Sequence, residues 1–302
     1  MFEILFLGTG GSVPSSDRAL NATFIRYEST RFLIDCGDGA QYPLLRNNGV
    51  RGDCLKVFIT HEHTDHLIGL IGLLYTLEIR GDKLLVEVYG GVNTIEKIRG
   101  LIDLAEIRNA VELIHILPGT IWEDNHIVCE AFKTQHTESS YGFIIEEKER
   151  RHFVSSKADE LRIPHGDIRK QLTQGNTVSL LDGTIIEPYM VFSEPQKGTK
   201  VVYVGDTAYN IDLAKHCEGA DCLIIEATYV EKDSELAKRN KHLTAKQAAS
   251  IAKQSSVTAL YLNHITTRYN DDVILDEAKS DFIETFIAHD TQSVKVSNIE
   301  RG

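Results

Sequence analysis

The chain has 302 residues, a formal net charge of −12 and 42% hydrophobic residues, which is enough apolar material for a substantial folded core. No uncharged apolar run is long enough to span a membrane, and the N-terminus lacks the positive leader of a signal peptide, so neither a membrane partner nor secretion is expected. The acidic balance argues against general attraction to nucleic acid, and no DNA partner is expected. We expect a globular, cytoplasmic protein.

The N-terminal half alternates short apolar runs with turn residues, a pattern that predicts strands ending in loops. These runs are FEILFL (2–7), ATFIRY (22–27), RFLID (31–35) and KVFIT (56–60). Two longer segments with helical spacing follow at 67–79 and 92–107, with strands predicted at 84–90 and 111–117 and a hairpin-like pair at 126–134 and 141–147. The mixed order of helices and strands favours an α/β fold without strict βαβ repeats.

Between Glu147 and Lys200 charged residues cluster, and prolines and glycines interrupt the chain. Only a short helix near 167–172 and a two-stranded hairpin in NTVSLLDGTIIEP (176–188) are predicted there. We interpret 147–200 as an inserted arm, with an ordinary long surface connection as the alternative. Its basic residues outnumber its acidic ones over 148–170, and they are Lys148, Arg150, Arg151, Lys157, Arg162, Arg169 and Lys170.

Regular patterning resumes after the arm. Strands are predicted at 200–206, 221–229 and 259–264, and helices at 211–217 and 244–253. Ile274, Ala278, Phe282 and Phe286 are spaced four apart, which predicts a closing helix over 272–289 that packs on the core.

The sequence HEHTDH at 61–66 places four metal-ligating side chains in six positions directly after a predicted strand. His61 and His63, two apart in extended backbone, can reach one point, while Asp65 and His66 in a first helical turn aim at a neighbouring one. The five cysteines are too few and too scattered for a cysteine site or a disulfide framework, so we expect reduced thiols. Imidazole and carboxylate groups suit zinc, and two adjacent ions are the natural fit.

Completing ligands are expected at three other strand ends, because loops at one edge of an α/β protein converge on a site. The candidates are His136, Asp206 and His264. Taken singly, each histidine is equally well explained as a packed or surface residue, and Asp206 as a helix cap. The six-residue cluster is hard to explain without a metal, and the cluster and the three candidates support one another.

These residues resemble the metallo-β-lactamase fold superfamily and, within it, the ribonuclease Z family of tRNA 3′-processing endonucleases. The resemblance extends over nearly the whole chain through FLGTGGSVP, DCGDGAQ, GLIGLL, GDT, IEATY, HLT and NHITTRY. It implies a four-layer αββα domain over 1–302, a dinuclear Zn²⁺ site with Mn²⁺ as an alternative ion, a homodimer, and an arm at 147–200 that binds the precursor tRNA.

The resemblance also implies individual roles. His61, His63 and His136 would hold one zinc, Asp65, His66 and His264 the other, and Asp206 would bridge them. The family's Glu and His pair maps to Glu226 and His242. Three positions depart from the family pattern, namely Ile225, Leu243 and Asp167, and they affect substrate positioning and arm geometry rather than the reacting groups.

The implied reaction is hydrolysis of a phosphodiester, in which two zinc ions would activate water and clamp the phosphoryl oxygens. His242, oriented by Glu226, is the candidate general acid for the leaving 3′-oxygen, and Asp65 could accept a proton from the water. Capping or structural hydrogen bonding would equally explain Glu226 and His242 without the resemblance.

Three other functions share parts of the pattern. A zinc thioesterase of the glyoxalase II type shares the metal ligands but needs no charged arm. A metallo-phosphodiesterase for small cyclic or aryl esters would also need no arm, because its substrate does not extend far from the metal site. A noncatalytic RNA-binding relative predicts at least one lost ligand, whereas all seven are present.

Overall fold

A computed structural model describes residues 1–108 and 111–298 and divides the chain into two units, Met1–Glu146 with Thr199–Gly302, and Glu147–Gly198. The predicted 1–302 domain thus includes two short stretches, 109–110 and 299–302, that lie outside the described residues. No helix in the described part of the chain is long and apolar enough to cross a membrane.

The first sheet of the larger unit has seven strands in the order β16-β1-β2-β3-β4-β5-β6. The bounds are β1 Phe2–Gly8, β2 Ala22–Tyr27, β3 Thr30–Ile34, β4 Cys54–Phe58, β5 Leu85–Gly90, β6 Val111–His115 and β16 Ser293–Val296. Strands β3 to β6 run parallel, so their carboxyl ends meet at one edge of the sheet.

The second sheet also has seven strands, in the order β15-β14-β13-β12-β9-β8-β7. The bounds are β7 Gly119–Glu123, β8 Ile127–Lys133, β9 Tyr141–Glu147, β12 Lys200–Val204, β13 Cys222–Glu226, β14 Ala259–Asn263 and β15 Thr285–Ile287. Strands β12 to β15 are parallel to one another. The predicted pair 126–134 and 141–147 forms the neighbouring strands β8 and β9, while β7 had no predicted counterpart.

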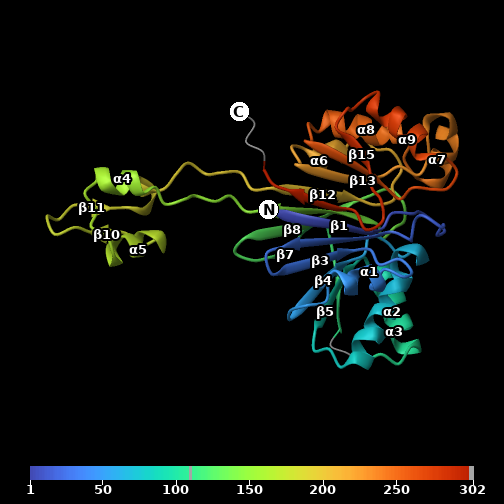
Figure 1. The fold of residues 1–302 in the computed structure, drawn as a ribbon, viewed down its shortest axis with the longest axis horizontal. Helices are drawn as coiled ribbons and strands as arrows, with labels where there is room; N and C mark the ends of the chain where they lie inside the picture. Colours follow the sequence, from blue (N-terminus) through green and yellow to red (C-terminus); the bar gives the residue numbers. More distant parts are fainter. Residues whose placement is uncertain (109–110, 299–302) are drawn as a thin grey trace. The chain divides into compact units, whose positions relative to one another are not determined.

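Helices cover the outer face of each sheet, which completes the four layers (Figure 1). On the first sheet these are α1 Gln41–Arg46, α2 Thr64–Arg80 and α3 Val92–Leu104. On the second they are α6 Leu213–Cys217, α7 Ser234–Asn240, α8 Ala245–Gln254 and α9 Asp271–Lys279, with a 3₁₀ turn, η2, at Glu231–Asp233. Large buried aromatic side chains, including Phe6, Phe58, Phe143 and Tyr203, fill the space between the sheets. The predicted αββα class is confirmed.

The closing helix expected over 272–289 is wrong beyond Lys279. Helix α9 buries Ile274 and Ala278, but the chain then turns at Ser280 and Asp281 and adds β15 to the sheet edge. Phe286 lies on that strand with 41% of its surface exposed. Apolar residues four apart are compatible with one continuous helix and also with a helix followed by a strand. The spacing alone therefore could not show that the helix ends at Lys279.

The smaller unit, Glu147–Gly198, has a core of its own. Its elements are α4 Ser155–Glu160, α5 Asp167–Thr173, the antiparallel pair β10 Val178–Ser179 and β11 Ile185–Ile186, and a 3₁₀ turn, η1, at Pro188–Val191. Six buried residues hold it together, namely Ala158, Ile163, Leu172, Val178, Ile186 and Val191. The predicted helix and hairpin are confirmed, whereas α4 and η1 had no predicted counterpart.

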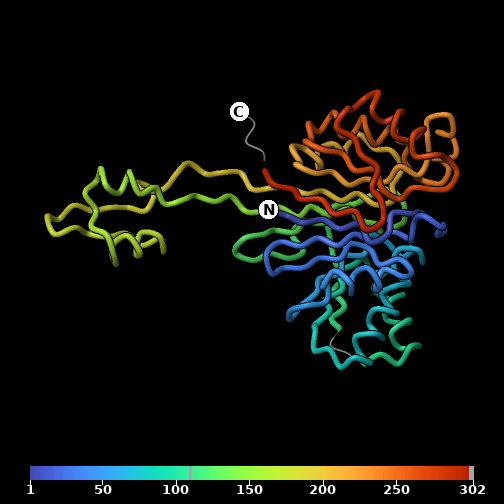
Figure 2. Tube along the Cα trace, viewed as in Figure 1, coloured from blue at the N-terminus to red at the C-terminus, as the bar shows by residue number. Residues whose placement is uncertain are grey.

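The chain leaves the larger unit and returns to it on neighbouring strands, as the trace in Figure 2 shows. Glu146 at the end of β9 lies opposite Lys200 at the start of β12 in antiparallel register. Because the exit and the re-entry are adjacent, the sheet is continuous across the insertion.

Candidate metal centre

Seven side chains converge from five separate places at the carboxyl ends of the strands. The loop after β4 supplies His61 and His63, and the first turn of α2 supplies Asp65 and His66. The connection from β8 to β9 supplies His136, and the ends of β12 and β14 supply Asp206 and His264. The structure therefore brings together every residue that the sequence proposed as a ligand, in two groups that can each hold an ion, and Asp206, His242 and His264 form a third such group.

The first group consists of His61, His63 and His136. His63 Nδ1 lies 2.9 Å from His61 Nε2 and 3.2 Å from His136 Nε2. Asp206 Oδ2 lies 3.7 Å from the Nε2 atoms of both His61 and His136. Three ring nitrogens and one carboxylate oxygen thus face a common point.

The second group consists of Asp65, His66 and His264. Asp65 Oδ2 lies 3.5 Å from His66 Nε2 and 3.6 Å from His264 Nε2. Asp206 reaches this group too, with Oδ2 at 3.5 Å from His66 Nε2 and Oδ1 at 3.5 Å from His264 Nε2. Asp206 is therefore the side chain that both groups share.

The spacing and chemistry of these groups fit divalent metal ions. Nitrogen and oxygen ligands about 2.0–2.2 Å from a tetrahedral zinc lie roughly 3.3–3.6 Å from one another, close to most of the separations found here. Three buried polar atoms, His66 Nε2, His264 Nε2 and Asp206 Oδ1, make no hydrogen bond within the described ranges. Unpartnered buried polar atoms are costly, and a shared cation would compensate all three.

Each candidate ligand histidine except His63 has a neighbour on its Nδ1 side that orients the ring. Asp35 Oδ2 lies 2.7 Å from His66 Nδ1, and the Asp35 carboxylate in turn accepts from Thr60 N at 2.8 Å. Thr228 Oγ1 lies 2.9 Å from His264 Nδ1, and the Lys241 carbonyl oxygen lies 2.9 Å from His136 Nδ1. Such contacts fix ring orientation and direct Nε2 toward a metal.

Sequence reasoning did not assign a role to Asp35, Thr60 or Thr228. The signal for Asp35 was present, because an acid ends the apolar strand RFLID within the DCGDGAQ motif. Asp35 and His264 also have positive φ angles of 56° and 57°, an uncommon conformation for residues other than glycine that is retained at functional sites.

Two glycines allow the close packing of the loops around the ligands. A Cβ atom on Gly11 would lie 2.5 Å from the His264 ring, and one on Gly69 would lie 1.9 Å from the Gly37 carbonyl oxygen. The motifs GTGG and GLIGLL therefore contain glycine where the backbone approaches the metal ligands and the DCGDG loop.

The charges of the site set the protonation of its ligands. Burial and the neighbouring charge of His66 lower the pKa of His61 well below that of free imidazole, which gives the neutral ring that metals bind. Burial raises the pKa of Asp206, but the charges of His264 and His66 outweigh it and hold that pKa well below its usual range. Burial lowers the pKa of His66, yet Asp206 and Asp35 raise it well above the usual value, so metal binding there competes with a proton.

Glu226 and His242 form a pair beside the two groups. His242 Nδ1 lies 3.0 Å from both oxygens of the buried Glu226 carboxylate and 3.9 Å from Asp206 Oδ2. Burial lowers the pKa of His242, but the charge of Glu226 and its hydrogen bond, together with Asp206, raise it to about 9. The imidazole is thus held in position and protonated near neutral pH.

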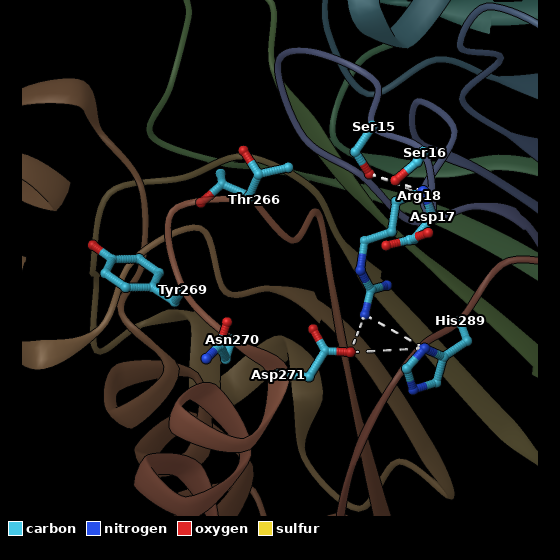
Figure 3. A pocket seen from close by; sticks show the side chains of 10 residues that line it. Ser15, Ser16, Asp17, Arg18, Thr266, Tyr269, Asn270, Asp271 and His289 are labelled. Carbon is cyan, nitrogen blue, oxygen red and sulfur yellow. Dashed lines mark hydrogen bonds and ion pairs between the residues drawn. The ribbon is translucent and has the colours of Figure 1, made fainter.

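A polar pocket of about 360 Å³ is lined in part by Thr266, which follows His264 by two residues in the chain. Figure 3 shows Arg18 at one wall, joined to Asp271 through Nη2 and Oδ2 at 2.6 Å, with His289 close by. Arg18 also donates to Thr9 Oγ1 and to the Ala288 carbonyl oxygen, both at 2.6 Å. Because Asp271 neutralises this buried guanidinium, the pocket offers hydroxyl and amide groups rather than net positive charge.

The seven basic residues of the arm are not equivalent. Arg169 is bonded within the arm to Asp159 and to the Ile163 carbonyl oxygen, and Lys157 donates to the Phe192 carbonyl oxygen. Arg150 pairs with Glu147 at 3.1 Å, and Lys148 is half-buried. Arg151, Arg162 and Lys170 are exposed.

Comparison with known proteins agrees with this architecture. The chain is similar to the metallo-beta-lactamase fold protein YhfI from Bacillus subtilis, with a TM-score of 0.71 and 21% identity over 97% of this chain and 98% of that one. It is also similar to human tRNase Z, short form, with a TM-score of 0.67 and 24% identity over 97% and 99% of the two chains. At these identities the likeness concerns the fold, and fold and site together define a metallo-β-lactamase fold protein.

Family models and curated relatives are more specific. Residues 2–163 match the model described as Anti-Pycsar protein Apyc1, and residues 190–265 match the Beta-lactamase superfamily domain. Ribonuclease Z from Bradyrhizobium sp. (strain ORS 278) is 38% identical over 98% of this chain and all of its own length. Ribonuclease Z from Archaeoglobus fulgidus is 35% identical, with 98% of each chain covered. The chain belongs to the ribonuclease Z family, and it is accordingly a hydrolase of the endoribonuclease class.

Proposed function

We propose that this protein removes the 3′ trailer from precursor tRNA by hydrolysis of one phosphodiester, which leaves a 3′-hydroxyl on the tRNA. The observation that carries the proposal is the Glu226–His242 pair beside seven converging ligands, in a chain whose full-length relatives are named ribonuclease Z. Those relatives match 98% of this chain, a share too large to leave out the arm, which supports a shared substrate.

Two zinc ions, or manganese in their place, would supply an activated water and neutralise phosphoryl charge when bound. His61, His63 and His136 would hold one ion, Asp65, His66 and His264 the other, with Asp206 between them. Asp65 Oδ2 accepts a hydrogen bond from Ser12 N at 3.0 Å, which orients its carboxylate. We assign Asp65 the additional role of accepting a proton from the attacking water.

His242 is proposed to donate a proton from Nε2 to the 3′-oxygen as the bond from that oxygen to phosphorus breaks. Its Nδ1 is engaged by Glu226, so Nε2 is the nitrogen left to face the substrate. Glu226 acts as a positioning residue, since it is buried and touches His242 rather than the reacting atoms. General acid catalysis of this kind contributes roughly 10²- to 10⁴-fold to a rate.

The arm is proposed to bind tRNA through its phosphate backbone. Of the seven candidate cations, the exposed ones, Arg151, Arg162 and Lys170, lie in a unit with its own core, which suits recognition of a folded RNA by shape. Because the chain as a whole is acidic, the basic segment 148–170 is the expected attachment point for a polyanion.

The alternative function is a metallo-phosphodiesterase for small cyclic or aryl phosphoesters. The match of residues 2–163 to the Apyc1 model, which is not a ribonuclease Z model, keeps this alternative open. A pocket of about 310 Å³ beside His242 is also large enough for a small ester.

One experiment separates the two functions. The protein is incubated with a 3′-extended precursor tRNA and with bis(p-nitrophenyl) phosphate, each with and without chelator, and is compared with a variant lacking 150–192. We expect chelator-sensitive cleavage of both substrates, with tRNA cleavage lost in the variant and ester turnover retained. Undiminished tRNA cleavage by the variant would remove the arm from the proposal, and absence of chelator-sensitive activity on either substrate would remove the enzyme assignment.

We further propose a homodimer in the cytoplasm. The homodimer rests on the family resemblance, and the five free thiols support a reducing compartment. Light scattering on the purified protein measures the oligomeric state, with a mass of twice 33.8 kDa expected.

A further inference from the structure

A pocket of about 310 Å³ opens beside His242, and no sequence pattern assigned it a role. The loop after β12 supplies one wall with Ala208 and Tyr209, and α7 with the start of α8 supplies the rest, namely Ser234, Glu235, Lys238 and Gln247. Tyr209 has 40% of its surface exposed, so its ring is available for contact. An exposed aromatic ring in a pocket that contains the proposed general acid is the feature that needs explanation.

The loop that carries Tyr209 is fixed to the Glu226–His242 pair. Thr207 N donates to Glu226 Oε1 at 2.7 Å, and the same carboxylate lies 3.0 Å from His242 Nδ1. Ala208 N donates to the Gln135 carbonyl oxygen at 2.9 Å, which secures the loop on its other side. One carboxylate therefore sets the position of His242 relative to the backbone that bears Tyr209.

The direction of the proposed reaction determines which part of the RNA lies here. The bond between phosphorus and the 3′-oxygen breaks, the electron pair stays on that oxygen, and the proton comes from His242. A general acid must lie within hydrogen-bond reach of the oxygen it protonates. The nucleoside that carries the leaving oxygen is consequently on the His242 side of the scissile phosphate, where the pocket is.

We propose that Tyr209 stacks on the base of the nucleotide that ends the processed tRNA, and so positions its 3′-oxygen at His242. This inference rests on the proposed function and adds a specificity residue to it. Every nucleobase has a π-face, so the contact tolerates any base at that position. Ser234 and Gln247 carry hydroxyl and amide groups in the same pocket that can hydrogen-bond to base edges.

The test uses metal-loaded protein and a processed tRNA whose 3′-terminal nucleotide is 2-aminopurine, whose fluorescence falls on stacking. We expect wild type and Tyr209→Phe to quench the fluorescence and Tyr209→Ala to lose most of the quenching. On precursor tRNA, kcat/KM of Tyr209→Ala should fall roughly 5- to 150-fold, the range for loss of one base–aromatic stack. The loss of kcat/KM on precursor tRNA should be roughly 5- to 150-fold larger than any loss on bis(p-nitrophenyl) phosphate. Tyr209→Phe should retain most of the wild-type kcat/KM on precursor tRNA.

Tyr75→Ala is the matched control, because Tyr75 is an exposed tyrosine about 15 Å along α2 from Asp65. Full quenching and an unchanged kcat/KM on precursor tRNA in Tyr209→Ala would overturn the pocket assignment alone. If the wild-type protein fails to cleave precursor tRNA, the proposed function fails, and the pocket assignment fails with it. Metal content and melting temperature of each variant exclude misfolding as the cause.

Discussion

The metal centre and the arm hold their functional side chains in opposite ways. In the metal centre, His61, His66 and Asp206 are buried; Thr60 Oγ1 lies 3.0 Å from His61 Nδ1, and Asp35, from the loop after β3, lies 2.7 Å from His66 Nδ1. In the arm, Arg151, Arg162 and Lys170 are exposed on a unit with a small core of its own. Hydrolysis at the metal centre requires side chains whose positions are fixed to within a few tenths of an ångström. Recognition of a polyanion requires charged side chains that are exposed to solvent.

Removal of the shared ligand should give the largest effect. Asp206→Ala takes away the oxygens that face both groups, so we expect loss of bound metal and a fall in rate of at least about 10³-fold on both substrates. Elemental analysis and initial rates measure this. Asp212→Ala, an exposed aspartate paired with Lys215, is the control and should retain metal and activity. Full activity without Asp206 would contradict the metal centre.

His242→Ala should separate acid catalysis from metal binding. We expect tRNA cleavage to fall roughly 10²- to 10⁴-fold while metal content stays the same. Bis(p-nitrophenyl) phosphate should suffer much less, because the nitrophenolate charge is delocalised and needs no proton to leave. His126→Ala, on an exposed loop, should behave as wild type. Equal losses on both substrates would indicate a structural role for His242.

The arm should contribute a smaller, salt-dependent effect. In the triple variant Arg151→Ala, Arg162→Ala and Lys170→Ala, we expect tRNA affinity to fall about tenfold or more and the slope of log affinity against log salt to shrink by about 3. Metal content should not change. The control replaces Lys83, Arg99 and Lys253, three exposed cations of the larger unit, with alanine. An unchanged salt slope in the arm variant would show that these cations do not meet phosphates.

Loss of a helix cap should have the smallest effect. Thr244 caps α8, with its Oγ1 accepting from Gln247 N at 3.2 Å and its own N–H donating to the Gln247 side chain. Thr244→Ala should cost about 1 kcal/mol of stability and lower Tm by about 2–4 °C, with both activities unchanged at an assay temperature well below Tm. Thr120→Ala, on the exposed strand β7, is the control for the melting measurement. A selective loss of tRNA cleavage in Thr244→Ala would place α8 in recognition instead.

The ligands could be predicted from the sequence because each one stands at the end of an apolar strand or in a dense local cluster. Asp35 and Thr228 were missed as orienting partners, since their contacts with His66 and His264 join positions 31 and 36 residues apart that no local pattern connects. Tyr209 was missed for a similar reason, because its pocket is completed by α7. In the arm, the composition indicated positive charge but could not reveal that Arg169 and Lys157 make hydrogen bonds within the arm itself.

The most direct test of the account is the chemistry of the cut ends. Precursor tRNA is cleaved by the metal-loaded protein in water enriched in ¹⁸O, and both products are analysed by mass spectrometry. We predict a tRNA that ends in a 3′-hydroxyl and a trailer whose 5′-phosphate contains one ¹⁸O atom, with no cleavage after chelation. A 2′,3′-cyclic phosphate on the tRNA, or a trailer phosphate without ¹⁸O, would contradict attack by water at this centre.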